Sequence, residues 1–168
     1  MLKILKKIRS AVLNIYYFHT LAKRVSFGKG VKIDGHVVVG YKVFFDDNVE
    51  VRNYTKEQSK IGDNVTVNRN SVLRGFYVIG DNVAIGPNCM IAGSNHCFSD
   101  PNIPIIQQGC SVEGIIICNN VWIGANSVLL DGITIGEGAV IGAGSVVTKS
   151  IPPYCVAVGN PCRVIKSR

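Results

Sequence analysis

The chain has 168 residues, of which 47% are hydrophobic and 17% are charged. This length suffices for one domain with a sizeable buried core, and the composition excludes a disordered chain. The 18 glycines follow no strict three-residue period, which excludes collagen.

The net charge of +7 is confined to the two ends of the chain. Residues 1–33 carry eight basic side chains and no acidic one, and residues 138–168 carry four basic side chains and no acidic one. Between them, residues 34–137 carry six basic and eleven acidic side chains. A nucleic-acid footprint gathers basic and aromatic side chains on one folded face. We therefore expect no nucleic-acid partner.

Residues 1–24 predict an N-terminal amphipathic helix. Apolar side chains recur there at three- and four-residue steps: Leu5, Ile8, Val12, Ile15 and Phe18. The longest stretch without Lys or Arg has thirteen residues, too short to span a bilayer, and no signal-peptide cleavage motif follows it. Two interpretations stay open. The helix packs on the protein itself or on a partner subunit, or residues 1–22 lie at an anionic membrane surface.

The six cysteines are scattered and form no C-x-x-C pair. Cysteines of this kind indicate free thiols in a reducing compartment, although a disulfide pair is not excluded. The localisation we expect is therefore cytoplasmic, either free or peripheral at the inner face of the cytoplasmic membrane.

A six-residue period governs the chain from Val25 onward. Counted in sixes from Val25 to Ile91, eleven of twelve positions are Val, Ile or Leu, and Thr55 is the exception. All six positions fit in a new phase from Ile117 to Val147. Helices do not have this period. A six-residue period is typical of short strands that each turn one aliphatic side chain inward and are joined by bends. Glycine and asparagine adopt the backbone dihedrals that such bends need. Stacked triangular coils would pair in parallel.

The pattern predicts an all-β protein, a parallel β-helix of about six coils over residues 25–168. Two segments depart from it. Residues 50–60 are polar around Thr55 and predict a loosened or bulged coil. Residues 97–114 contain Pro101 and Pro104 and predict an excursion loop between the fourth coil and the last two. A loop of that length inside a compact repeat is usually functional.

Three segments resemble the hexapeptide-repeat acyltransferases. They are "IGDNV", "VWIGANSVLLDGITIGEGAVIGAGSVVTKSIPP" and "AVGNPCRVIK". The resemblance covers residues 25–168 and is closest to sugar and polysaccharide O-acetyltransferases and to galactoside and maltose acetyltransferases. It implies a left-handed parallel β-helix, a homotrimer, and acetyl-CoA as cosubstrate, with a basic C-terminal tail.

The segment "AGSNHCFSDP" resembles the family's loop with the catalytic histidine, which makes His96 the candidate general base. A sugar hydroxyl is too weak an acid to ionise near neutral pH, and neutral imidazole, with a reference pKa of about 6.5, is the usual base. The candidates for orienting the imidazole or contacting the acceptor are Asn95, Asp100, Arg74 and Tyr77. Asp100 is equally a turn-former before Pro101.

Eight residues match family positions near CoA: Trp122, Ala125, Ala143, Thr148, Lys149, Pro153, Arg163 and Lys166. The backbone N–H groups of Ala125 and Ala143 suit a thioester oxygen, which gains negative charge in the transition state. The cations after Glu137 suit the CoA phosphates. A bound metal is not expected, because His36 and His96 lie sixty residues apart and a three-histidine site would need them in neighbouring coils.

The function expected is an acetyl-CoA-dependent O-acetyltransferase acting on a sugar hydroxyl. The acceptor would be a polysaccharide, a lipid-linked glycan or a nucleotide sugar, and transfer would be direct, at a site between two subunits. Two alternatives stay open. One is N-acetylation of an amino sugar, and the other is a non-catalytic β-helix that serves as a scaffold subunit.

Overall fold

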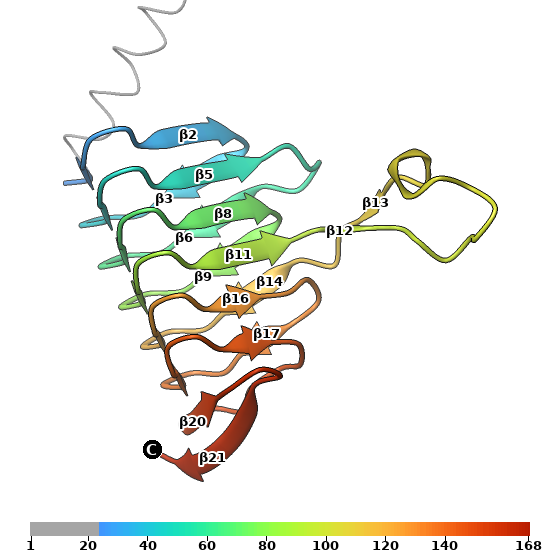
Figure 1. The fold of residues 1–168 in the computed structure, drawn as a ribbon. Coiled ribbons are helices and arrows are strands. Elements are labelled where there is room, and N and C mark those ends of the chain that lie inside the picture. The colour runs from blue at the N-terminus through green and yellow to red at the C-terminus, as the bar shows by residue number, and fades with distance from the viewer. Residues whose placement is uncertain (1–23) are drawn as a thin grey trace, which may run out of the picture.

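The protein is a parallel β-helix in which three sheets surround one core (Figure 1). The computed structural model describes residues 24–168. The predicted N-terminal helix lies outside the described residues. Within residues 24–168, no helix is long and apolar enough to cross a membrane.

Each sheet collects one strand from each successive coil, except that the sixth coil joins sheet 3 only through the bridge between Ile151 and Ile135. Sheet 1 contains β1 (Ser26–Phe27), β4 (Phe44–Phe45), β7 (Thr66–Val67), β10 (Ala84–Ile85), β15 (Trp122–Ile123), β18 (Val140–Ile141), β20 (Cys155–Val158) and β21 (Arg163–Ser167). Sheet 2 contains β2 (Lys32–Gly35), β5 (Glu50–Asn53), β8 (Val72–Gly75), β11 (Met90–Gly93), β16 (Val128–Leu129) and β19 (Val146–Val147). Sheet 3 contains β3 (Val37–Val39), β6 (Ser59–Ile61), β9 (Tyr77–Ile79), β14 (Ile115–Ile117) and β17 (Thr134–Ile135).

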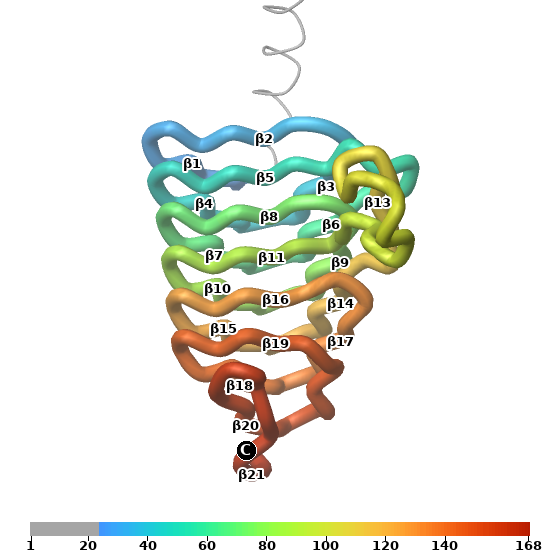
Figure 2. The backbone as a smooth tube through the Cα atoms, turned by 45° about the vertical axis from the view of Figure 1, so that its right-hand side comes forward, coloured from blue at the N-terminus to red at the C-terminus, as the bar shows by residue number. Residues whose placement is uncertain are grey.

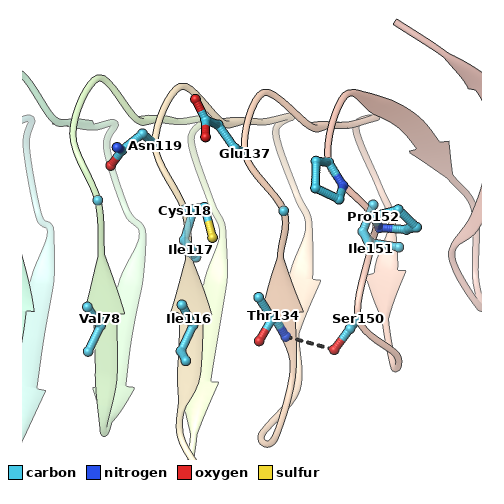
Figure 3. Close-up of a pocket in the computed structure, with 13 residues that line it drawn as sticks. Val78, Ile116, Ile117, Cys118, Asn119, Thr134, Glu137, Ser150, Ile151 and Pro152 are labelled. Atoms are coloured by element: carbon cyan, nitrogen blue, oxygen red, sulfur yellow. Dashed lines mark hydrogen bonds between the residues drawn. The ribbon is translucent and has the colours of Figure 1, made fainter.

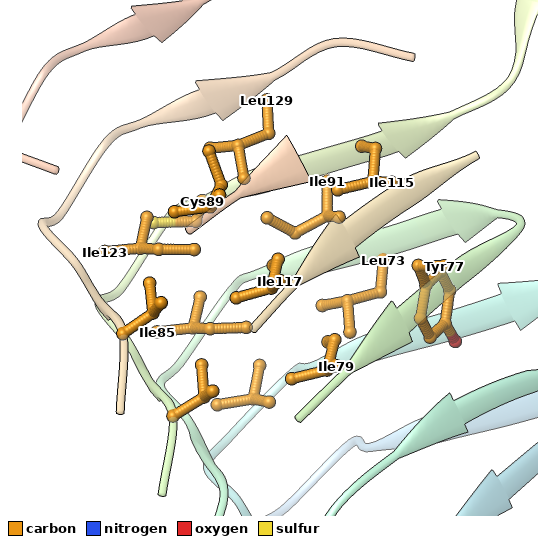
Figure 4. Close-up of a cluster of buried hydrophobic side chains, with 14 of the residues drawn as sticks. Leu73, Tyr77, Ile79, Ile85, Cys89, Ile91, Ile115, Ile117, Ile123 and Leu129 are labelled. Carbon is orange, nitrogen blue, oxygen red and sulfur yellow. The ribbon is translucent and has the colours of Figure 1, made fainter. Parts of the chain in front are cut away.

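The coils stack in register, as the tube in Figure 2 shows. Six coils carry strands in sheets 1 and 2, and β20 begins a seventh in sheet 1. All neighbours within these sheets pair in parallel except β21, which folds back antiparallel on β20. The inward aliphatic side chains of successive coils form the continuous core drawn in Figure 4. The predicted fold class is thus confirmed.

The phase of the predicted repeat was wrong before Thr55. The structure pairs Phe45 with Val67 and Val51 with Leu73, so the inward positions lie two residues after those we counted. The cause is an insertion at residues 54–58, where β5 and β6 are separated by five residues, whereas a single residue separates β2 from β3 and β8 from β9. The aliphatic series survives in the second coil because the counted positions Val43 and Val49 are buried alongside Phe45 and Val51.

The insertion is an ordered turn held by a buried asparagine, and the coil is not loosened there. The side chain of Asn53 is fully buried, its Nδ2 donates to the Glu57 carbonyl at 2.8 Å, and its Oδ1 accepts from the Thr55 N–H at 2.8 Å. Buried polar groups must be paired, and Asn53 pairs the backbone of the turn. The bulge is therefore a defined turn between two regular strands.

Asparagines and Gly124 have different roles at the bends. Positive φ angles fall on seven bend asparagines: Asn48, Asn64, Asn70, Asn82, Asn88, Asn120 and Asn126. Gly124, which follows an inward isoleucine, lacks a positive φ. A Cβ on Gly124 would instead lie 2.5 Å from the backbone N of Ala143 in the next coil. The glycine therefore permits close stacking of coils, whereas we had expected it to permit the bend.

The excursion loop leaves the prism within the fourth coil, between β11 and β14. It spans residues 94–114, so it begins three residues earlier than predicted, and β14 completes the fourth coil only after it. Its stem is the antiparallel pair β12 (Asn95–His96) and β13 (Cys110–Ser111), and its outer part contains the 3-10 helix η1 (Ile105–Gln107). Figure 1 shows the loop standing away from the stacked coils. We call the corner between sheets 2 and 3, from which both insertions emerge, the loop corner.

Candidate functional site

His96 sits on the stem of the excursion loop, directly opposite Cys110. The Cys110 Sγ atom lies 3.6 Å from His96 Nδ1, and both residues are exposed. Directly opposed residues of an antiparallel pair point to the same face, which brings the two side chains together. Because Nδ1 faces the thiol, Nε2 is the ring nitrogen left open to a substrate.

The predicted partner of the imidazole, Asp100, is engaged elsewhere. One of its carboxylate oxygens accepts from the Asn102 N–H at 2.8 Å, and its carbonyl accepts from Gln108 Nε2 at 2.8 Å. These bonds are typical of a turn-former. Asn95 is exposed on β12 and pairs in register with Ser111. The sequence carries no signal for the His96–Cys110 contact, because the pairing of a loop stem depends on where the loop turns.

A pocket of about 610 Å³ opens at the loop corner beside the stem. We call it the loop-corner pocket, and its walls are Arg52, Tyr54, Thr55, Lys56, Glu57, Arg74, Gly75, Ser94, Cys110 and Val112. It joins the insertion of the second coil, β8 of the third coil and the stem of the excursion loop. Arg74, predicted from the sequence to face an acceptor, lies in its wall, and Cys110 links the pocket to His96.

Tyr77 does not reach this surface. It is fully buried, pairs in register with Ile115, and lies at one end of the cluster in Figure 4. Its hydroxyl makes no hydrogen bond to another described residue, and burial raises the pKa of the phenol. The prediction that Tyr77 contacts an acceptor is therefore withdrawn. The sequence correctly predicted that Tyr77 lies one coil before His96, but it did not predict that the side chain points into the core.

The predicted CoA contacts fall at two different corners of the chain. Trp122 is 57% exposed on sheet 1, and Ala125 and Ala143 follow β15 and β18 at the corner between sheets 1 and 2. Thr148 and Lys149 are exposed at the loop corner, two coils beyond His96. One chain therefore does not bring Trp122 and His96 together, since they lie on different sides of the prism.

The C-terminal contacts are spread in the same way. Arg163 and Lys166 are exposed on β21, at the sheet 1 side. Pro153 lines a second pocket, of about 740 Å³, along sheet 3 (Figure 3). The walls of this pocket are mostly apolar, and the Ser150 hydroxyl accepts there from the Thr134 N–H at 2.9 Å. Pro153 is the one predicted CoA contact that borders it.

Two further predictions concern metals and thiols. No group of three or more His, Cys, Asp or Glu side chains that could hold a metal ion occurs within residues 24–168. All six cysteines lie in that part of the chain and are free thiols. Cys89 and Cys162 are buried, whereas Cys110 is exposed.

Comparison with known proteins gives this geometry a family. The model described as "Bacterial transferase hexapeptide (six repeats)" matches residues 58–93 and 114–149, on either side of the excursion loop. The crystal structure of a maltose O-acetyltransferase from Clostridium difficile 630 is similar to this chain, with 34% sequence identity and a TM-score of 0.57. The match covers 84% of this chain and 70% of that one. The chain belongs to the hexapeptide-repeat acyltransferase family.

Two other relatives extend the comparison. AntD, an N-acyltransferase from Bacillus cereus solved with dTDP and 3-hydroxybutyryl-CoA, is 27% identical, with 87% of this chain and 81% of that chain covered and a TM-score of 0.76. A probable acetyltransferase of Mycobacterium tuberculosis is 33% identical over 158 residues, 89% of this chain and 52% of its own length. The hexapeptide-repeat chain thus spans about half the length of the curated relatives it matches.

Proposed function

We propose that this protein is an acetyl-CoA-dependent acetyltransferase that acts on a sugar hydroxyl, with His96 as the general base. The observation that carries the proposal is the exposed imidazole on the stem of the excursion loop, next to a pocket large enough for a monosaccharide. The names of two relatives support the reaction class, since one is a maltose O-acetyltransferase and the other was solved with an acyl-CoA.

The chemistry follows from the position of the ring. Nδ1 of His96 faces the Cys110 thiol, so Nε2 accepts the proton of the acceptor hydroxyl as its oxygen attacks the thioester carbonyl. The carbon–sulfur bond then breaks, and the imidazolium returns the proton to the departing CoA sulfur. No proton is gained or lost overall, and His96 ends the cycle neutral.

The site is proposed to lie between two subunits of a homotrimer. His96 and Trp122 lie on different sides of one chain but only one coil apart along the axis of the prism. Around a threefold axis, the loop corner of one subunit faces a different surface of its neighbour at the same height. This arrangement would bring His96 of one subunit to Trp122, Ala125 and Ala143 of the next.

The direct test is thioester turnover. The protein is mixed with acetyl-CoA and a panel of neutral, anionic and amino sugars, and the release of free thiol is followed. We expect release that depends on a hydroxyl acceptor. Release only with amino sugars would favour N-acetylation, the second candidate, which the similarity to AntD supports. A protein that neither binds nor cleaves acetyl-CoA would be the scaffold alternative and would refute the proposal.

The donor side is tested at Lys149 and Arg163. Both side chains are exposed cations, and a bond to a CoA phosphate is made equally in the ground and transition states. Replacing either with alanine should raise the KM for acetyl-CoA roughly tenfold and change kcat little, since a hydrogen bond to a charged group contributes about 1.5 kcal/mol. Lys29→Ala, an exposed lysine in the first coil, is the control. A fall in kcat alone would show that the phosphates bind elsewhere.

A further inference from the structure

Three cationic side chains border the loop-corner pocket. Arg52 on β5 and Arg74 on β8 are direct register partners, and Lys56 belongs to the insertion at 54–58. Coils one and three have a single residue where the second coil has this insertion, so Lys56 and its wall of the pocket are a special feature of that coil. The cations therefore come from two coils and one loop and meet at one opening.

These cations are incompletely paired. Glu50 Oε1 lies 3.0 Å from Arg52 Nε and 4.0 Å from Arg74 Nε, so two guanidinium groups share one carboxylate. The Arg74 side chain is 54% exposed, and it donates no hydrogen bond to another described residue. An arginine in this state presents a planar set of N–H donors, which match the two oxygens of a phosphate or carboxylate.

The other acidic groups nearby leave Arg74 available. Glu57, next to Lys56 in the insertion, is the carboxylate in the pocket wall, and no ion pair joins it to Arg74. Asp34 accepts from the Tyr54 hydroxyl at 2.7 Å, and this hydrogen bond raises the pKa of Tyr54 and keeps the phenol protonated. Tyr54, which lines the pocket, is thus a neutral group there and engages Asp34.

The position of the pocket identifies which substrate it receives. Along the loop corner, the pocket occupies the second and third coils, His96 the fourth, and Thr148 and Lys149 the sixth. The residues expected to meet CoA on this corner lie on the far side of His96 from the pocket. A molecule in the pocket would therefore be an acceptor, and Cys110, which lines the pocket, lies beside His96.

We propose that the loop-corner pocket binds an acceptor sugar through an oxyanion, so that the enzyme acetylates an anionic sugar rather than a neutral one. Arg74 is the principal contact, with Arg52 and Lys56 adding to the positive field. The oxyanion is a phosphate, as in a sugar phosphate, or a carboxylate, as in a uronic acid. This inference rests on the proposed function, because it names the acceptor class of that site.

The test compares matched sugars in binding and in turnover. Glucose, glucose 1-phosphate and glucuronate are each measured by saturation-transfer NMR and by thiol release from acetyl-CoA. We expect at least one anionic sugar to bind about tenfold more tightly than glucose, the effect of roughly one charge-assisted hydrogen bond, and the preference to weaken as salt is raised. The phosphate and carboxylate arms show which oxyanion fits.

Variants assign the preference to the pocket. Arg74→Gln should bring the binding of anionic sugars down to the level of glucose, whereas Arg74→Lys should retain part of the preference. The matched control is Arg69→Gln, an exposed arginine of the same coil at another corner, paired with Asp46 at 3.1 Å. It should behave as the wild type.

The outcomes separate this inference from the proposed function. Equal binding of glucose and both anionic sugars, or no binding of any of them, overturns the anionic pocket. If Arg69→Gln and Arg74→Gln lose the preference for anionic sugars equally, the anionic pocket is overturned as well. Binding that prefers the anion and depends on Arg74, but without any thiol release, supports the pocket and instead contradicts acetyl transfer.

Discussion

Replacement of His96 by alanine is expected to lower kcat for acetyl transfer by about 10²–10⁴-fold, the usual contribution of a positioned general base. The coil stack should be unaffected, because His96 is exposed on the stem and contributes nothing to the core. Binding of acetyl-CoA should also be nearly unchanged, since the predicted donor contacts lie elsewhere. Steady-state kinetics and calorimetric titration with acetyl-CoA measure the two quantities separately.

The pH profile distinguishes a base from a structural residue. Wild-type kcat should rise with pH and then level off, because a general base accepts a proton only in its unprotonated form. The His96→Ala variant should lose this rise. His36→Ala is the matched control, since His36 is an exposed histidine whose Nδ1 lies 3.1 Å from the Thr55 carbonyl oxygen. If His96→Ala retained activity within a few-fold of the wild type, the base would have to be another group or the acceptor itself.

The second large effect concerns the core beneath the excursion loop. Ile91 is fully buried on β11, between its register partners Leu73 and Leu129. Ile91→Ala should lower the free energy of unfolding by about 2–5 kcal/mol, because it removes buried methyl groups and leaves a cavity between stacked coils. Urea unfolding at one fixed protein concentration measures the change, since any oligomer makes stability depend on concentration.

The same substitution outside the core provides the comparison. Ile106 lies on η1 and is 81% exposed, so Ile106→Ala should change stability by no more than about 0.5 kcal/mol. A large loss at both positions would mean that the outer loop is covered by another subunit. A small loss of stability in Ile91→Ala would mean that the coils collapse into the cavity, which contradicts their close packing.

Two expectations were tested by where residues lie in space. Tyr77 was predicted to contact an acceptor, and it is buried in the core instead. Asp100 was expected either to orient His96 or to form a turn, and the structure gives it turn contacts while placing Cys110 beside the imidazole. Both results depend on pairing across a loop or a coil, which no local motif records.

The six-residue pattern by itself determined the parallel β-helix and, to within three residues, the place of the excursion loop, whereas the family came from the resemblance of three segments to known acyltransferases. The pattern could do so because each short strand needs one inward aliphatic residue, a requirement that the chain meets locally and repeats in every coil. The segment around His96 was likewise recognisable, since its residues are adjacent in the sequence.

Only the tertiary structure decided the register and the pocket. The five residues at 54–58 shift the phase of the repeat, and this shift places Arg52 beside Arg74, 22 positions later in the chain. The stem likewise brings Cys110 to His96 across fourteen positions. Such contacts depend on how many residues each turn absorbs, and a turn's length can vary without disturbing the aliphatic series on either side of it. The series therefore predicts the coils, whereas the meeting of side chains between coils is set by the folded loops.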